Sequence, residues 1–237
     1  MLVWLLARID PPIVCRIVRR LNRFVVLVSV DGKLVKAYLN NTGRLRDYLI
    51  EGRLAYASTA PPNRRTTYNL FAIDEDGLAA LIDTRLQTVF FEEALNRGLI
   101  PWLSGFRIVK RNVRLYSSLI DYLLKLEEKD VYMEVKSAVM RIDRSVASYP
   151  DCPSIRGRKH VEDLISASSR GLNCVILFLA SLPYVDTFKP NSSVDPKLTD
   201  LLKLAIRAGV LVKAVSMYYD PSDSSIYLDN PELRVEL

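Results

Sequence analysis

The spacing of apolar residues changes near residue 81, and this change limits the fold more than any other feature of the chain. Before it, short stretches rich in β-branched and aromatic residues alternate with turn-forming residues, which is typical of short strands. After it, stretches with the spacing of a helix alternate with continuous apolar runs, which is typical of helices packed on a sheet. We therefore expect two domains, residues 1–80 and 81–237.

The first 80 residues predict a small β-barrel. The stretches CRIVRRLNRFVVLVSV and KLVKAYL flank Asp31-Gly32, a dipeptide that strongly favours a two-residue hairpin turn. The stretches RLAYAST and TTYNLFAI predict further strands on either side of the turn-rich APPNRR. Roughly five short strands with tight turns suit a closed barrel, and an OB-like barrel is one candidate.

The remainder of the chain predicts an α/β domain with a mixed central sheet. One helix is expected to begin with Thr84 as its cap and to end at Gly98, and a second is expected to end at Gly171. A third opens with Asp195 as its cap and Pro196 at the first helical position. The strands expected among these helices are FRIVKRNV, YSSLIDYLLKL, VYMEVKS, NCVILFLA and VLVKAVSMYY. Because helices and strands alternate, an α/β arrangement is favoured.

The composition indicates a globular protein and excludes several classes of site. Of 237 residues, 49% are hydrophobic and 25% are charged, which is enough apolar material for a sizeable core. No apolar run approaches the roughly 18 residues of a membrane span, so we expect no membrane association. The apolar start of the chain is too short for a signal peptide and predicts a first strand, and a cytoplasmic location is expected. The cysteines, Cys15, Cys152 and Cys174, form no zinc-binding pattern, and the single histidine, His160, lies in no catalytic triad pattern.

Positive charge is concentrated in the first part of the chain. Residues 1–91 hold 13 Lys and Arg against 8 Asp and Glu, a surplus of 5 out of the total net charge of +6. A basic surplus favours a polyanionic partner such as nucleic acid. A soluble surface that is simply basic explains the same surplus equally well.

A charged hairpin stands out in the second part. SSLIDYLLKLEEKDVYMEVKS holds two apolar runs around a charged turn, yet Asp121 lies in the first run and Glu134 and Lys136 in the second. If Leu126 pairs with Val131 across the turn, Asp121 faces Lys136 and lies diagonal to Glu134. Because strand side chains alternate, the two acids and the lysine then share one face of the sheet.

Two neighbouring carboxylates repel each other, and a divalent cation would neutralise them. Carboxylate oxygens favour Mg²⁺ or Mn²⁺, with the Val135 carbonyl as a further ligand. A metal can lower the pKa of a water molecule and bind a phosphoryl oxygen, while Lys136 could orient the attacking water. This set of groups suits phosphodiester hydrolysis. The alternative is a solvated strand face with a weak ion pair of about 0.2–1 kcal/mol.

Basic residues in three other places are candidate nucleic-acid contacts. A helix is expected to begin near Arg156, and i, i+3, i+4 spacing puts Arg156, Lys159 and His160 on one of its faces, where a phosphate could bind. A proline-rich loop carries Arg64 and Arg65 next to an aromatic residue, as single-stranded nucleic-acid sites often do. The remaining two candidates, which share one strand face, are Arg16 and Arg20. For each group, a solvated surface is the alternative.

Four stretches together resemble the sugar fermentation stimulation protein family, SfsA. They are NNTGRL, SSLIDYLL, YMEVKSAVM and PDCPSIRGRKHVEDL, in the order and spacing of that family. The resemblance implies an N-terminal OB-like domain, a C-terminal domain similar to PD-(D/E)xK nucleases, nonspecific DNA binding, and a role in regulating sugar metabolism. It puts the nuclease-like acids on Asp121 and Glu134 and the lysine on Lys136. The chain departs from the family pattern at Leu119, at Ile155 and near Lys110, where an arginine or acids are usual.

Three hypotheses follow from the sequence. The first is a DNA-binding protein with a metal-dependent nuclease site at Asp121, Glu134 and Lys136. The second is a nonspecific DNA-binding regulator whose nuclease fold is catalytically idle, which the lost family acids favour. The third is an RNA-binding or RNA-processing protein, because an OB barrel binds RNA as well as DNA.

Overall fold

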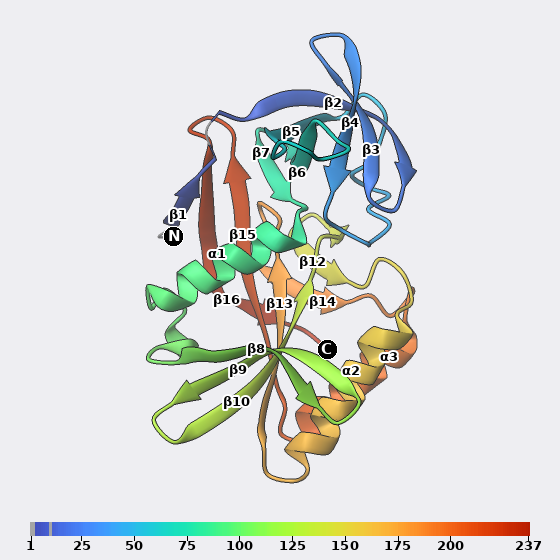
Figure 1. The fold of residues 1–237 in the computed structure, drawn as a ribbon. Coiled ribbons are helices and arrows are strands. Elements are labelled where there is room, and N and C mark those ends of the chain that lie inside the picture. Colours follow the sequence, from blue (N-terminus) through green and yellow to red (C-terminus); the bar gives the residue numbers. More distant parts are fainter. Residues whose placement is uncertain (1–2, 10) are drawn as a thin grey trace. The chain divides into compact units, whose positions relative to one another are not determined.

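We describe the fold from a computed structural model, which describes residues 3–9 and 11–237 (Figure 1). The chain forms two compact units, and each takes residues from separate stretches. The barrel unit comprises the residues up to Glu93, Ser181–Pro183 and Met217–Asp229, and the sheet unit comprises Ala94–Ala180, Tyr184–Ser216 and Asn230–Leu237. Strands β15 (Leu211–Asp220) and β16 (Ser225–Val235) contribute residues to both units. The expected boundary at residue 81 stays a prediction.

Five strands of the barrel unit close into a ring. They are β2 (Ile13–Asn22), β3 (Val25–Val30), β4 (Lys33–Leu39), β5 (Leu54–Thr59) and β6 (Tyr68–Glu75). The pairing order is β2-β3-β4-β6-β5, and β5 pairs with β2 to complete the ring. Only the β4–β6 pairing is parallel, which is the topology of an OB barrel.

The barrel follows from the alternation of apolar residues. Cys15 and Ile17 on β2 are buried, as are Val26 and Val28 on β3, so every second side chain enters the core. The predicted hairpin at Asp31-Gly32 is confirmed, because Val30 pairs with Lys33 and both turn residues have positive φ, 48° and 78°.

Two short strands and one helix accompany the ring of five strands in the first part of the chain. Strand β1 (Trp4–Arg8) pairs with β16, and β7 (Leu78–Leu81) pairs with β6. Helix α1 (Thr84–Asn96) follows. The expected cap at Thr84 is wrong: Asp83 accepts hydrogen bonds from the amides of Arg85 and Leu86, while the Thr84 hydroxyl donates to the carbonyl of Asn40.

The sheet unit contains the predicted mixed sheet. Its strands run in the order β8 (Arg107–Leu115), β9 (Ser118–Leu126), β10 (Lys129–Ser137), β13 (Asn173–Ala180) and β15. The β8–β9 and β9–β10 pairs are antiparallel, whereas β10–β13 and β13–β15 are parallel. Strand β13 is buried along almost its whole length, which suits a strand with parallel neighbours on both sides.

Helices α2 (Ile155–Ser168) and α3 (Pro196–Arg207) lie side by side, and α2 packs against β13 (Figure 1). The predicted cap of α3 is confirmed, because Asp195 accepts a hydrogen bond from the Leu198 amide and Pro196 starts the helix. The short helix η1 (Pro101–Leu103) precedes β8. No helix in the described ranges is long and apolar enough to cross a membrane.

A second group of short strands was not predicted. It comprises β11 (Arg141–Asp143), β12 (Val146–Tyr149) and β14 (Thr187–Pro190), and it continues to the end of β16. Strand β11 pairs with β12 in an antiparallel manner, whereas the pairing of β12 with β14 is parallel. Five residues separate the end of β12 from the start of α2.

Candidate active site

The β9–β10 hairpin brings the two predicted acids together, although its register differs from the prediction. Leu126 pairs with Lys129, not with Val131, across a two-residue turn in which Glu127 has a φ of 51°. The last pair of this ladder is Tyr122 with Met133, so the next position sets Asp121 opposite Glu134. The predicted register is wrong by two residues, and a shift of two keeps every side chain on its original face.

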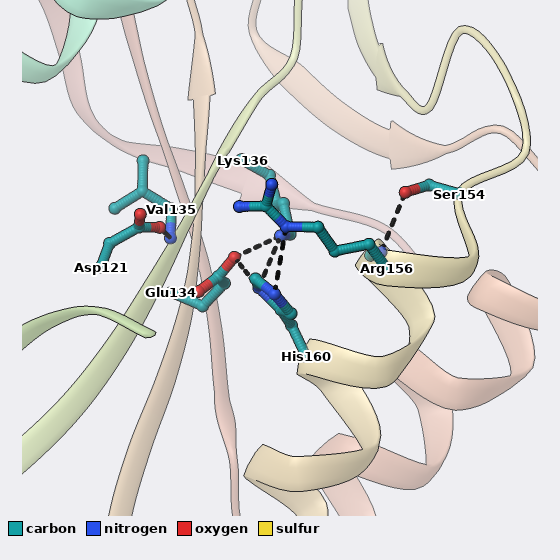
Figure 2. A network of polar contacts seen from close by, with 8 residues as sticks. Asp121, Glu134, Val135, Lys136, Ser154, Arg156 and His160 are labelled. Atoms are coloured by element: carbon teal, nitrogen blue, oxygen red, sulfur yellow. Dashed lines mark hydrogen bonds and ion pairs between the residues drawn. The ribbon is translucent and has the colours of Figure 1, made fainter. Parts of the chain in front are cut away.

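Asp121 lies where the ladder between the two strands ends. Its Oδ2 accepts a hydrogen bond of 2.7 Å from the backbone amide of Val135, in place of a partner strand (Figure 2). A residue in an extended strand points its N–H and its C=O to the same side. The Val135 carbonyl therefore lies on the Asp121 side of β10, and its role as a third metal ligand stays a prediction.

Glu134 is only 2% exposed, and its two oxygens have different surroundings. Oε1 contacts both the Lys136 ammonium and Nδ1 of His160 (Figure 2). Oε2 is buried and has no hydrogen-bond partner among the described residues. A buried carboxylate oxygen without a partner is costly and calls for a ligand.

His160 joins the site from helix α2, and its neighbours assign its tautomer. The Nε–H of Arg156 lies 3.4 Å from His160 Nε2 and can only donate. Nε2 is therefore the acceptor, and Nδ1 carries the proton that it donates to Glu134. The Lys136 ammonium, 3.4 Å from Nδ1, then meets a second donor, and both converge on the same Glu134 oxygen.

The two carboxyl groups have opposite pKa shifts. Burial, together with the neighbouring charge of Glu134, raises the pKa of Asp121 to about 6. Burial also acts to raise the pKa of Glu134, but the His160 hydrogen bond and the Lys136 charge outweigh it and hold that pKa below its usual value. In the pH range between these two pKa values the negative charge of the pair lies mainly on Glu134, and above about pH 6 both groups are charged.

The donor set fits one hard divalent cation. Within residues 3–9 and 11–237, no group of three or more His, Cys, Asp or Glu side chains could hold a metal ion. Two carboxylates and one backbone carbonyl are nevertheless enough for Mg²⁺, which keeps several waters and takes phosphate oxygens of a substrate as ligands. The partnerless Oε2 of Glu134, next to Asp121, is where such an ion fits.

The basic face predicted on α2 is divided in the structure. His160 is 4% exposed and hydrogen bonds to Glu134, and its predicted contact with a nucleic-acid phosphate stays a prediction. Lys159 pairs with Asp163 at 3.0 Å, and this carboxylate also accepts a hydrogen bond from Ser117. Arg156 is exposed apart from its contact with His160. Of the three residues, Arg156 is the one placed to reach a ligand near the acids.

The candidates in the barrel unit also differ from one another. The Arg20 guanidinium donates to the carbonyls of Asn22, Arg23, Asn41, Gly43 and Arg44. It therefore holds the NNTGRL turn in place, and its role as a nucleic-acid contact stays a prediction. Arg16 is exposed and donates to the Gly52 carbonyl at 2.8 Å. Arg64 and Arg65 are exposed on the loop between β5 and β6, where their role as nucleic-acid contacts stays a prediction.

Sequence reasoning missed the residues that position α2. Ser154 caps the helix by accepting a hydrogen bond of 2.9 Å from the Gly157 amide. A Cβ on Gly157 would lie 2.9 Å from the Ser154 hydroxyl and 3.1 Å from the hydroxyl of Tyr149. Asp195 accepts from the Ser154 amide at 3.2 Å and so connects the start of α2 to the start of α3. The only signal in the sequence was Ser154 directly before the helical stretch.

Together these features define a class of protein. One unit contains a closed five-stranded OB barrel, and the other a mixed sheet with Asp121 on one strand and Glu134-x-Lys136 on the next. That is the arrangement of the PD-(D/E)xK nuclease fold.

The comparison with known families makes this more specific. Residues 85–223 match the sugar fermentation stimulation protein RE domain, and residues 18–82 match the SfsA N-terminal OB domain. The chain belongs to the sugar fermentation stimulation protein family, SfsA.

Similar proteins cover almost the whole chain. A sugar fermentation stimulation protein homolog of Pyrococcus furiosus is 40% identical over 232 residues, which are 98% of this chain and 99% of the homolog. One of Archaeoglobus fulgidus is 39% identical over 230 residues, 97% of this chain and 98% of the homolog. The solved structure of Pyrococcus furiosus SfsA in complex with Ca²⁺ is similar with a TM-score of 0.93 and 38% identity, over 99% of this chain and 100% of that one.

Proposed function

We propose that this protein binds DNA without sequence preference and cleaves phosphodiester bonds at a site for one divalent cation, formed by Asp121 and Glu134. The observation that carries the proposal is the buried Oε2 of Glu134, which has no partner among the described residues. It lies next to a second, half-buried carboxylate, that of Asp121, on the same face of the sheet. Such a pair is stable only with a cation, a proton or a permanent positive partner.

Asp121 and Oε2 of Glu134 would hold the cation, with the Val135 carbonyl as a third ligand. The Ca²⁺ bound by the similar Pyrococcus furiosus protein supports a divalent ion at this fold. For the reaction itself we propose Mg²⁺ or Mn²⁺, since both take oxygen ligands. When bound, such an ion supplies positive charge that lowers the pKa of water and stabilises the phosphoryl oxygens.

The other residues would bind and orient the reacting groups. An ammonium has three N–H donors, so Lys136 can keep its contact with Glu134 and still donate to a phosphoryl oxygen or to the attacking water. His160 holds Oε1 of Glu134 and thereby leaves Oε2 for the cation. Arg156, exposed beside His160, would bind a phosphate of the DNA near the cleaved bond.

A second candidate function has an observation in its favour. The Lys136 ammonium already contacts Glu134, and a permanent internal cation neutralises one acid without any metal. In that case the protein is a DNA-binding regulator with an idle nuclease fold. A role in the regulation of sugar metabolism, which the name of the similar proteins suggests, suits either candidate.

Cleavage of plasmid DNA in Mg²⁺ or Mn²⁺, with EDTA as the blank, tests the proposal. We expect cleavage by the wild type, its loss in Glu134→Gln, and wild-type cleavage in Glu128→Gln. Glu128 lies on the turn of the same hairpin with 98% of its side chain exposed, so the control removes the same charge without touching the site.

Four outcomes separate the candidate functions. Cleavage that depends on Glu134 and on the metal supports the nuclease. DNA binding without cleavage in either metal supports the idle regulator. The absence of DNA binding, measured at low salt where electrostatic binding is strongest, contradicts both. Binding to RNA in preference to DNA would support the RNA-binding alternative.

A further inference from the structure

Strand β8 is an exposed and strongly basic strand at one edge of the central sheet. Its sequence RIVKRNVRL holds four basic residues and no acidic one. Among the described strands it pairs with β9 alone, so its other edge is unpaired. Arg107, Lys110 and Arg114 are exposed, and none of them makes a hydrogen bond or an ion pair with another described residue.

The register of the sheet places these three residues on the face of the two acids. Arg107 pairs with Lys125, Lys110 with Leu123, and Arg114 with Leu119. These partners on β9 lie two or four residues from Asp121, and residues an even number apart in a strand share a face. Residues opposite each other in antiparallel strands also share a face.

We call Arg107, Lys110 and Arg114 the β8 basic row. The fourth basic residue of the strand, Arg111, pairs with Tyr122 and belongs to the other face. A bulge between Ile108 and Lys110 brings Lys110 onto the row. Three positive charges thus follow one strand, next to the strand that carries Asp121.

No acidic side chain among the described residues forms an ion pair with the β8 basic row. Arg107 lies directly opposite Lys125, and like charges at opposite positions destabilise a pair of strands. Lys125 pairs at 3.5 Å with Glu128 on the exposed turn, and this ion pair includes no residue of the row. A polyanion along β8 would relieve this repulsion.

We propose that the β8 basic row binds the phosphate backbone of the DNA strand that reaches the Asp121–Glu134 site. This inference rests on the proposed function and adds to it the path of the substrate. At about 3.3 Å per residue, the row spans roughly 20 Å. At about 3.4 Å per phosphate along one strand, that length matches about six nucleotides.

Protection of the sheet edge is the competing explanation for the charges. Lysine and arginine on an edge strand prevent other strands from pairing with it. Edge protection needs charge but no particular face, whereas three of the four basic residues of β8 lie on the face of the acids. This bias toward one face favours a ligand.

The test compares DNA binding of the wild type with a variant in which all three residues of the β8 basic row are replaced by Gln. A matched control, Lys197→Gln/Lys203→Gln/Arg207→Gln, removes three exposed charges from α3 in the same unit. Binding of a fluorescent DNA duplex is followed by anisotropy over a series of salt concentrations. Mn²⁺ calorimetry on each variant reports whether the acidic pair is intact, and sedimentation reports self-association.

We expect the row variant to lose about three units of the salt slope, one per phosphate contact, and the α3 variant to lose less than one. A row variant with the wild-type slope and affinity would overturn the inference and leave the proposed function standing, and self-association of that variant would then assign the charges to edge protection. An equal loss in both variants would also overturn it, because net charge alone would explain the result. If the wild type does not bind DNA, the proposed function itself fails.

Discussion

The contact between Glu134 and Lys136 is expected to show strong energetic coupling. The side chains are 3% and 11% exposed, so water screens the pair very little. Lys136→Met leaves a buried carboxylate held by His160 alone, and breaking a buried pair in this way costs about 3 kcal/mol. Glu134→Gln costs about 1 kcal/mol, since it also removes the repulsion with Asp121 and the amide keeps an acceptor for His160.

The double variant, Glu134→Gln with Lys136→Met, measures the coupling energy between the two side chains. With both charges removed, no unpaired charge stays buried, and we expect a loss of about 2 kcal/mol where the single losses add to about 4. The coupling is measured by urea unfolding in EDTA at pH 7.5, followed by tryptophan fluorescence and circular dichroism. The exposed pair Lys125–Glu128 serves as the control, and its coupling should stay below about 0.5 kcal/mol. A coupling for the buried pair as small as that of the control would refute the account of the site.

Three further predictions concern the start of α2, the cysteines and the metal site. Gly157→Ala should destabilise the protein by about 1 kcal/mol, because the new methyl group would displace the capping hydroxyl of Ser154. This loss outweighs the helix propensity of alanine, which exceeds that of glycine by about 1 kcal/mol, and thermal unfolding measures the difference. Of the three cysteines, only the half-buried Cys152 should react rapidly with a thiol reagent in the native state. Burial raises the pKa of the Cys15 thiol to about 12 and that of the Cys174 thiol to about 11, and two rapidly reacting thiols would contradict the fold. The affinity for Mn²⁺ should fall about tenfold for each pH unit below about pH 6, because the ion must displace one proton from Asp121 in that range, and it should be constant above pH 6. Calorimetry between pH 5 and 8 measures this dependence, and an affinity that does not change with pH would contradict Asp121 as a ligand.

The features that were predicted correctly are those fixed by local chemistry. Asp31-Gly32 dictates a two-residue turn because both residues accept a positive φ. Asp195 and Pro196 define the start of α3 with a capping side chain and a preset φ. The shared face of Asp121 and Glu134 was also predicted, since the alternation of a strand does not change when the register shifts by two residues.

What was missed depends on partners far away in the sequence. The hairpin register followed from the left-handed conformation of Glu127, which nothing in a charged EEKD turn signals. The role of Arg20 required carbonyls about 20 residues away, brought within reach only by the closed barrel. His160 could be placed on a helix face from spacing, but which face is buried depends on how α2 packs on the sheet. The short strands β12 and β14 are too brief for an alternating pattern to identify.

Anomalous diffraction from crystals grown with Mn²⁺ tests the central claim most directly. We predict an anomalous peak between the carboxylate of Asp121 and Oε2 of Glu134, within coordination distance of the Val135 carbonyl, and its absence in crystals of Glu134→Gln prepared in the same way. A wild-type map without a peak at this position, with Lys136 still on Glu134, would contradict a metal site and leave the idle DNA-binding regulator as the account of this protein.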